Sequence, residues 1–164
     1  MRAYFPFTFI VGNHKYCCIW YSDSVDGFVM EDGKIKCFAD MSKLISYVVA
    51  QNLKMAEETS LLFVDGFTHW LVEPTEIDCE EFLMFWNVMT GLAHSAGKLF
   101  YGDLDTKYLN AIYDRLFVGS QLHTQQLSKS MKVLVWDKQE RSELTKVVES
   151  GLSIITSCLI LPHN

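Results

Sequence analysis

The residues of this sequence that could do chemistry are chiefly acids, eight of which stand in one stretch without a base. No lysine or arginine occurs between residues 55 and 97, where the acids are Glu57, Glu58, Asp65, Glu73, Glu76, Asp78, Glu80 and Glu81. The whole chain has a formal net charge of −6, so this stretch carries more than the entire negative excess. Such a segment repels the phosphates of nucleic acids and attracts a basic protein surface. A solvated face that only aids solubility is the alternative explanation.

Residues for catalysis or metal binding lack the spacing that such sites need. The sequence holds no Gly-x-Ser-x-Gly motif, no glycine-rich phosphate loop and no two histidines four residues apart. Neighbouring carboxylates such as Glu80 and Glu81 do not face each other on a helix, so adjacency does not make them an acid–base pair. We therefore predict no enzyme activity, no metal and no cofactor. A hydrolase or transferase whose carboxylates meet only in the folded chain is the alternative.

The five cysteines indicate a reducing compartment. Cys17 and Cys18 are adjacent, so their side chains would point to opposite faces of a strand. No Cys-x-x-Cys pair occurs, and no spacing of cysteine and histidine suits zinc. We predict reduced, mostly buried thiols and a cytoplasmic protein.

Length and composition fit one globular domain over residues 1–164. The chain is 49% hydrophobic and 13% aromatic, which is enough to fill a core and unlike a disordered chain. No apolar run approaches the roughly 18–20 residues of a membrane span. Residues 1–7 include Pro6, and no small-residue cleavage site follows them, so we expect a first strand and not a signal peptide.

The first third of the chain has the pattern of an antiparallel β meander. Aromatic and β-branched residues predict strands at 4–11, 16–21, 28–31 and 34–38. Asp26-Gly27 and Asp32-Gly33 are hairpin signals, because an aspartate–glycine pair tolerates the positive φ angles of a type I′ turn.

The middle of the chain predicts a helix on each side of a third hairpin. A helix is expected at 41–54, and a hairpin over 61–72 has Asp65-Gly66 as its turn. Asp78, with a glutamate three residues later, begins the second helix, and Gly97 ends it.

The last third predicts two further helices and a buried strand. One helix begins at Asp105 and is followed by a polar loop over 119–130; another begins at Asp137 and ends at Gly151. The nearly continuous apolar run 152–161 is typical of a buried central strand. Together these elements predict a single α+β domain, with an N-terminal antiparallel β meander, helices packed on the sheet and a C-terminal buried strand.

Four motifs stand out in the second half of the chain, at 77–87, 113–119, 136–140 and 147–152. The first is an acidic helix start followed by an aromatic-rich face, and the third is a tryptophan followed by a capped helix. Over residues 77–152 the chain thereby resembles a family of small immunity proteins from bacterial contact-dependent growth inhibition and related polymorphic toxin systems. The family's Tyr-Asp-Lys-Leu-Phe-Trp-Gly is similar to 113–119, where Val118 replaces the tryptophan.

The resemblance implies a cytoplasmic immunity protein that binds a cognate toxin domain in a 1:1 complex and protects the producing cell. The toxin would be a basic nuclease, usually RNA-cleaving, whose phosphate-binding cations suit an acidic partner. The predicted partner-binding residues are Glu57, Glu58, Asp65, Trp70, Glu73, Glu76, Asp78 and Glu80. Trp70 would be an aromatic anchor, with core packing as its alternative role. An acidic adaptor or chaperone-like protein for a secreted effector is the alternative function; neither function involves direct contact with nucleic acid or membrane.

Overall fold

The main sheet is built on a hairpin of the aromatic N-terminal residues. The computed structural model describes residues 1–124 and 134–160, and only the backbone of residues 122–124. β1 (Ala3–Val11) pairs antiparallel with β2 (His14–Ser22), and β3 (Gly27–Phe28) pairs antiparallel with β2. β6 (Ser60–Phe63) pairs parallel with β1, which gives the order β3-β2-β1-β6. The predicted meander is thus confirmed for β1 to β3, whereas the parallel edge strand was not predicted.

The last part of the predicted meander forms a separate two-stranded sheet. β4 (Met30–Glu31) and β5 (Lys34–Ile35) pair antiparallel on either side of Asp32 and Gly33. The φ angles of these two residues are 51° and 75°, as a type I′ turn requires. The hairpin predicted at Asp32-Gly33 is therefore confirmed.

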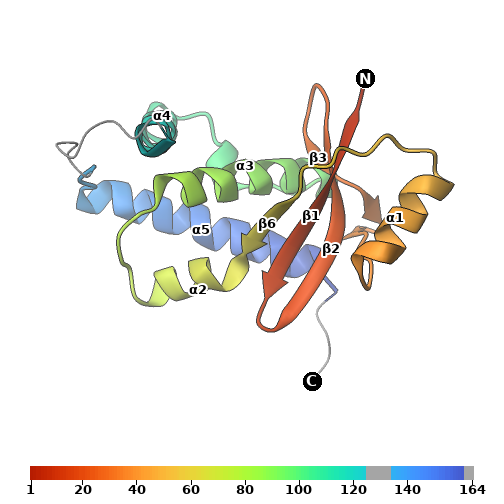
Figure 1. The fold of residues 1–164 in the computed structure, drawn as a ribbon. Helices are drawn as coiled ribbons and strands as arrows, with labels where there is room; N and C mark the ends of the chain where they lie inside the picture. The colour runs from red at the N-terminus through yellow and green to blue at the C-terminus, as the bar shows by residue number, and fades with distance from the viewer. Residues whose placement is uncertain (125–133, 161–164) are drawn as a thin grey trace.

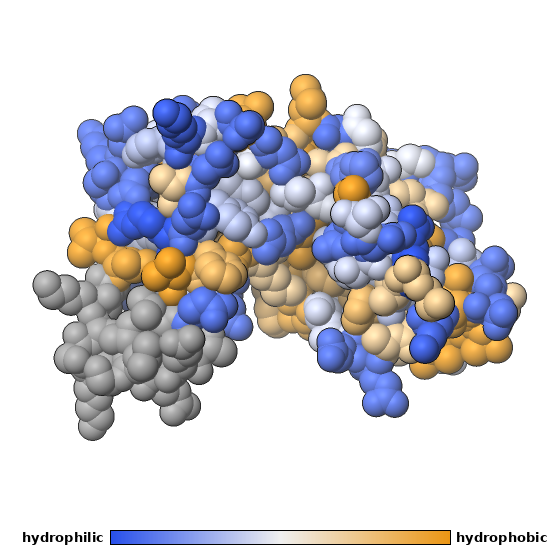
Figure 2. All heavy atoms as spheres, turned by 90° about the horizontal axis from the view of Figure 1, so that it is seen from above, coloured by the Kyte–Doolittle hydropathy of each residue, from blue (hydrophilic) through white to orange (hydrophobic). Residues whose placement is uncertain are grey.

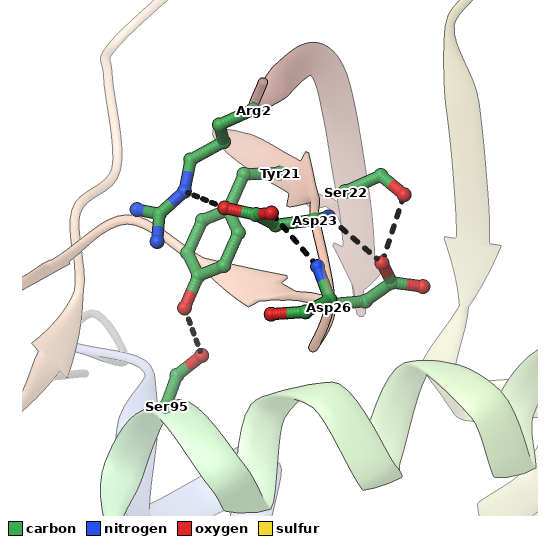
Figure 3. A network of polar contacts seen from close by, with 7 residues as sticks. Arg2, Tyr21, Ser22, Asp23, Asp26 and Ser95 are labelled. Carbon is green, nitrogen blue, oxygen red and sulfur yellow. Dashed lines mark hydrogen bonds and ion pairs between the residues drawn. The ribbon is translucent and has the colours of Figure 1, made fainter.

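The two-residue hairpin predicted at Asp26-Gly27 is wrong, because Gly27 already lies in β3 and side chains hold the turn (Figure 3). Asp26 accepts a hydrogen bond of 2.8 Å from the hydroxyl of Ser22. Gly27 serves close packing, since a Cβ at this position would lie 2.5 Å from the hydroxyl of Tyr21. That hydroxyl lies 3.5 Å from Ser95 Oγ, which ties the turn to α3 (Cys79–Ala96).

The two faces of the sheet are covered by different helices (Figure 1). On one face, Leu44 and Val48 of α1 (Met41–Ala50) pack with Cys17 and Ile19. On the other face, Cys18 belongs to the main core. The adjacent cysteines therefore face opposite sides, as predicted. All five thiols are free, and Cys37 is the one that is exposed.

Four helices complete the main core. They are α2 (Val64–Val72), α3, α4 (Lys107–Thr124) and α5 (Lys138–Cys158), with the short 3-10 helix η1 (Tyr101–Asp103) between α3 and α4. Figure 1 shows α3 and α5 running side by side, with α2 below them and α4 at the end away from α1. Among the described residues, no helix is both long and apolar enough to cross a membrane. The predicted α+β architecture is confirmed.

The residues predicted as a third hairpin form a strand and a helix instead. β6 ends at Phe63, and the Asp65-Gly66 pair lies in the first turn of α2. The buried residues Val64, Phe67 and Trp70 recur every three positions, which is helical spacing. The prediction over 61–72 is wrong because the turn signal is weaker than this periodicity.

The predicted C-terminal buried strand is also wrong. α5 does not end at Gly151 but continues to Cys158. Its buried residues Gly151, Ile154, Ile155 and Cys158 are separated by the intervals of one helix face. The run looks continuous in the sequence because no charged residue marks the exposed face of the last two turns of this helix, at 152–158.

Helix α4 is longer than the sequence predicts. It begins at Lys107, close to the predicted start at Asp105, and its backbone remains helical to Thr124. The polar loop predicted over 119–130 is therefore wrong at 119–124, and its remainder lies outside the described residues. Leu109, Ile112 and Leu116 are buried at helical spacing and hold α4 against the core.

A hydrogen bond between η1 and α5 gives a first testable prediction. Tyr101 donates to Glu143 over 2.5 Å, which lowers the pKa of Glu143 and raises the pKa of Tyr101. We expect Tyr101→Phe to lower the free energy of unfolding by about 1–2 kcal/mol at pH 7. A carboxylate with a lowered pKa stabilises the fold above its unfolded pKa, and this contribution is lost as the pH falls through the folded value. Urea unfolding at several pH values should show the difference shrinking on acidification; a difference independent of pH would contradict this account.

Candidate partner-binding site

The structure separates the eight acids of the base-free stretch into three groups, all of them exposed. Glu57 and Glu58 precede β6, and Asp65 lies at the start of α2. The other five, which we call the acidic corner, surround the connection between α2 and α3: Glu73, Glu76, Asp78, Glu80 and Glu81.

The first two groups lie at opposite ends of β1. Next to Glu57, the N–H of Ala56 bonds to the carbonyl of Tyr4 near the start of this strand. Asp65 accepts a bond of 2.6 Å from the N–H of Gly12, just beyond the end of the strand. Nine residues of strand span roughly 26 Å. The predicted partner-binding residues therefore do not form one surface, and Asp65 has a structural role in fixing the β1–β2 turn.

The acidic corner, by contrast, combines four of the predicted acids with Glu81 in one short segment. Asp78 caps α3 by accepting a bond of 3.1 Å from the N–H of Glu81, as the sequence predicts. The positive end of the α3 dipole further stabilises the carboxylates of its first turn. Capping thus explains why acids stand here, but it leaves most of their oxygens facing solvent.

No described lysine or arginine forms an ion pair with the acidic corner. Glu73 lies 3.7 Å from the imidazole of His69, and this contact is an ion pair only when the histidine is protonated. The guanidinium of Arg141 reaches this segment from α5, but it bonds to the carbonyl of Thr75 at 3.4 Å and not to a carboxylate. The corner therefore keeps its negative charge available to an outside partner.

A pocket of about 340 Å³ adjoins the acidic corner, between β6, α2 and the first turns of α3. Its lining combines apolar side chains with three carboxylates: Leu62, Phe67, Phe82 and Met84 with Glu76, Asp78 and Glu81. At roughly 30 Å³ per water molecule, it has room for about eleven waters. This volume is at the low end of the range for ligand sites.

Trp70 is not the exposed anchor that the sequence predicts. Its side chain is 4% exposed, and its ring packs edge-on against Phe82 with centroids 5.0 Å apart. Yet Trp70 also lines the pocket, and its indole N–H is buried without a hydrogen-bond partner. A buried donor left unpaired costs about 1–3 kcal/mol. Because less than 1 Å² of this nitrogen is exposed, an acceptor from outside could reach it only if the surrounding side chains moved.

The pocket itself is what sequence reasoning missed. Phe67, Phe82, Met84 and Glu81 line it, and none of them was a predicted site residue. The helical spacing of Phe67 and Trp70 is a signal that these two share one face. Nothing in the sequence indicates that β6 would lie beside that face, because the contact depends on the parallel pairing of β6 with β1.

The arrangement is suited to binding a cationic group. Among the residues whose side chains the structure describes, no group of three histidine, cysteine or acidic side chains could hold a metal ion. Comparison of the chain with protein-family models, curated proteins and solved structures found no match. The resemblance to immunity proteins therefore stays a prediction.

Proposed function

We propose that this chain is an immunity protein that binds a cognate toxin domain one to one and neutralises it in the cytoplasm of the producing cell. The observation that carries the proposal is the acidic corner, where five exposed carboxylates lack a lysine or arginine partner among the described residues. The toxin domain would be a basic nuclease, with RNA as the expected substrate. The chain would act by occupying the toxin, without catalysis of its own.

Electrostatics explains why such a partner suits this surface. A nuclease holds phosphates with lysine and arginine side chains, which also form charge-assisted hydrogen bonds with carboxylates. An acidic protein can therefore compete with the nucleic acid for the same donors. Complementary charge also speeds the encounter of the two proteins. Fast binding matters here, because the inhibitor must reach the toxin before the toxin cleaves RNA.

A role as an adaptor or chaperone-like protein for a secreted effector is the second candidate. Phe63 and Val72, near the acidic corner, are 59% and 83% exposed and could contact an apolar partner. However, on the face that Figure 2 presents, which is the top of the molecule in Figure 1, hydrophobic residues gather in separate groups among hydrophilic ones. Chaperone-like binding would use a continuous apolar patch and would depend little on salt.

Co-expression tests the proposal directly. We expect cells that produce the toxin domain encoded immediately upstream of this gene to resume growth when this chain is also produced. A non-cognate toxin domain serves as control and should stay lethal, because immunity depends on specific binding. Continued growth arrest with the cognate domain, despite soluble expression of this chain, would overturn the immunity function.

A further inference from the structure

The pocket beside the acidic corner has features that the immunity function does not itself require. Its inner wall is apolar, with Leu62 and Phe67 each 5% exposed or less, while its carboxylates come from Glu76, Asp78 and Glu81. A ligand that satisfies both must carry an apolar stem and a positive head. Among protein side chains, arginine and lysine have this character.

The indole of Trp70 can report on occupation of this pocket. Trp70 belongs to the pocket lining, and its indole nitrogen is buried with no acceptor among the described residues. By contrast, the indole N–H of Trp86 donates to the carbonyl of Gly102 at 3.2 Å. Occupation of the pocket would therefore alter the surroundings of the Trp70 indole, whereas Trp86 lies outside the lining.

We propose that this pocket receives one arginine of the partner protein, with its aliphatic stem against the apolar wall and its guanidinium against the three carboxylates. Arginine fits better than lysine, because its planar head is weakly hydrated, pairs with carboxylates in a fork and stacks on aromatic rings. Phe63 in the pocket lining is 59% exposed and provides such a ring. The arginine pocket depends on the proposed function in one respect only, namely that the toxin would supply the arginine.

A titration with short peptides tests the pocket without the toxin. The probe is acetyl-Gly-Arg-Gly-amide, added to 15N-labelled protein while the indole N–H resonances are followed by NMR. We expect the Trp70 resonance, assigned with Trp70→Phe, to move to saturation while that of Trp86 stays in place. The same peptide with citrulline, which is neutral and of similar shape, should bind about tenfold more weakly.

Two matched variants complete the test. Replacing Glu76, Asp78 and Glu81 by Gln, Asn and Gln should abolish the preference for arginine over citrulline, and asparagine still caps the helix. Glu57→Gln with Glu58→Gln should retain the preference, because these acids lie outside the pocket lining. A Trp70 resonance that does not move, or equal affinity for both peptides, would overturn the arginine pocket. Either result would leave the growth test of immunity unaffected.

Discussion

Replacing Phe85 by alanine is expected to lower the free energy of unfolding by about 3–5 kcal/mol. Phe85 lies on α3 with 1% of its surface exposed, and its ring centroid is 4.3 Å from that of Phe67 on α2. On the other side it faces Gly151 of α5, where an added Cβ would lie 2.6 Å from the ring. One side chain thus joins three helices. Domains of this size have roughly 5–15 kcal/mol of stability, so the loss would be a large part of the total.

Urea unfolding measures this loss, with Phe117→Ala as the matched control. Phe117 on α4 is 49% exposed, and its removal should cost less than about 1 kcal/mol. The contact with Gly151 gives a further check. Gly151→Ala should destabilise the wild-type chain through collision with Phe85, but should be tolerated better once Phe85 is alanine. Additive effects of the two substitutions, or a cost at Phe85 no larger than at Phe117, would show that the three helices do not meet there.

Local signals in the sequence predicted helix starts and one turn well. The aspartates that cap α3 and α5 were read correctly, and Asp137 forms a full capping box with Glu140. Gly97 ends α3 with a φ of 64°, as its type predicts. These predictions are confirmed because a helix cap or a positive φ angle depends on residues within one turn of each other.

The same kind of signal failed where longer-range packing decides the structure. Asp32-Gly33 forms a type I′ turn, whereas Asp65-Gly66 lies inside a helix. The two dipeptides are identical, so the difference comes from their surroundings. The residues around the second pair bury a helical face against α3 and α5, and that burial outweighs the local preference for a turn.

The candidate site likewise combines features that the sequence predicts with features that depend on long-range packing. The base-free stretch and its acids are visible in the sequence, and five of the acids do come together. That Glu58 and Asp65 lie far apart follows only from the extended course of β6 between them. The pocket is likewise formed by elements that meet through the sheet, and sequence spacing carries no information about that meeting.

The second large effect concerns the charge of the acidic corner. We expect Glu73→Lys with Glu76→Lys to weaken binding of the cognate toxin domain by about 100-fold or more, since like charges placed opposite each other cost several kcal/mol. Both side chains are exposed, and a lysine at position 73 suits the C-terminal end of α2, so the fold should be retained.

The control has the same change in net charge at a different place. Glu57→Lys with Glu58→Lys alters two acids that precede β6, while the corner follows α2 (Figure 1). At physiological ionic strength, charge is screened over about 8 Å, so the distant pair should change the dissociation constant by less than about threefold. Comparing the two double variants therefore separates a local contact from a general effect of net charge.

Isothermal titration calorimetry of the toxin domain against the wild type and these two variants measures that contrast most directly. Tight binding by the wild type, nearly unchanged binding by the variant at 57 and 58, and a loss of about 100-fold or more at 73 and 76 would place the partner on the carboxylates between α2 and α3. Equal losses in both variants, or no loss in either, would mean that the toxin is held elsewhere on the molecule.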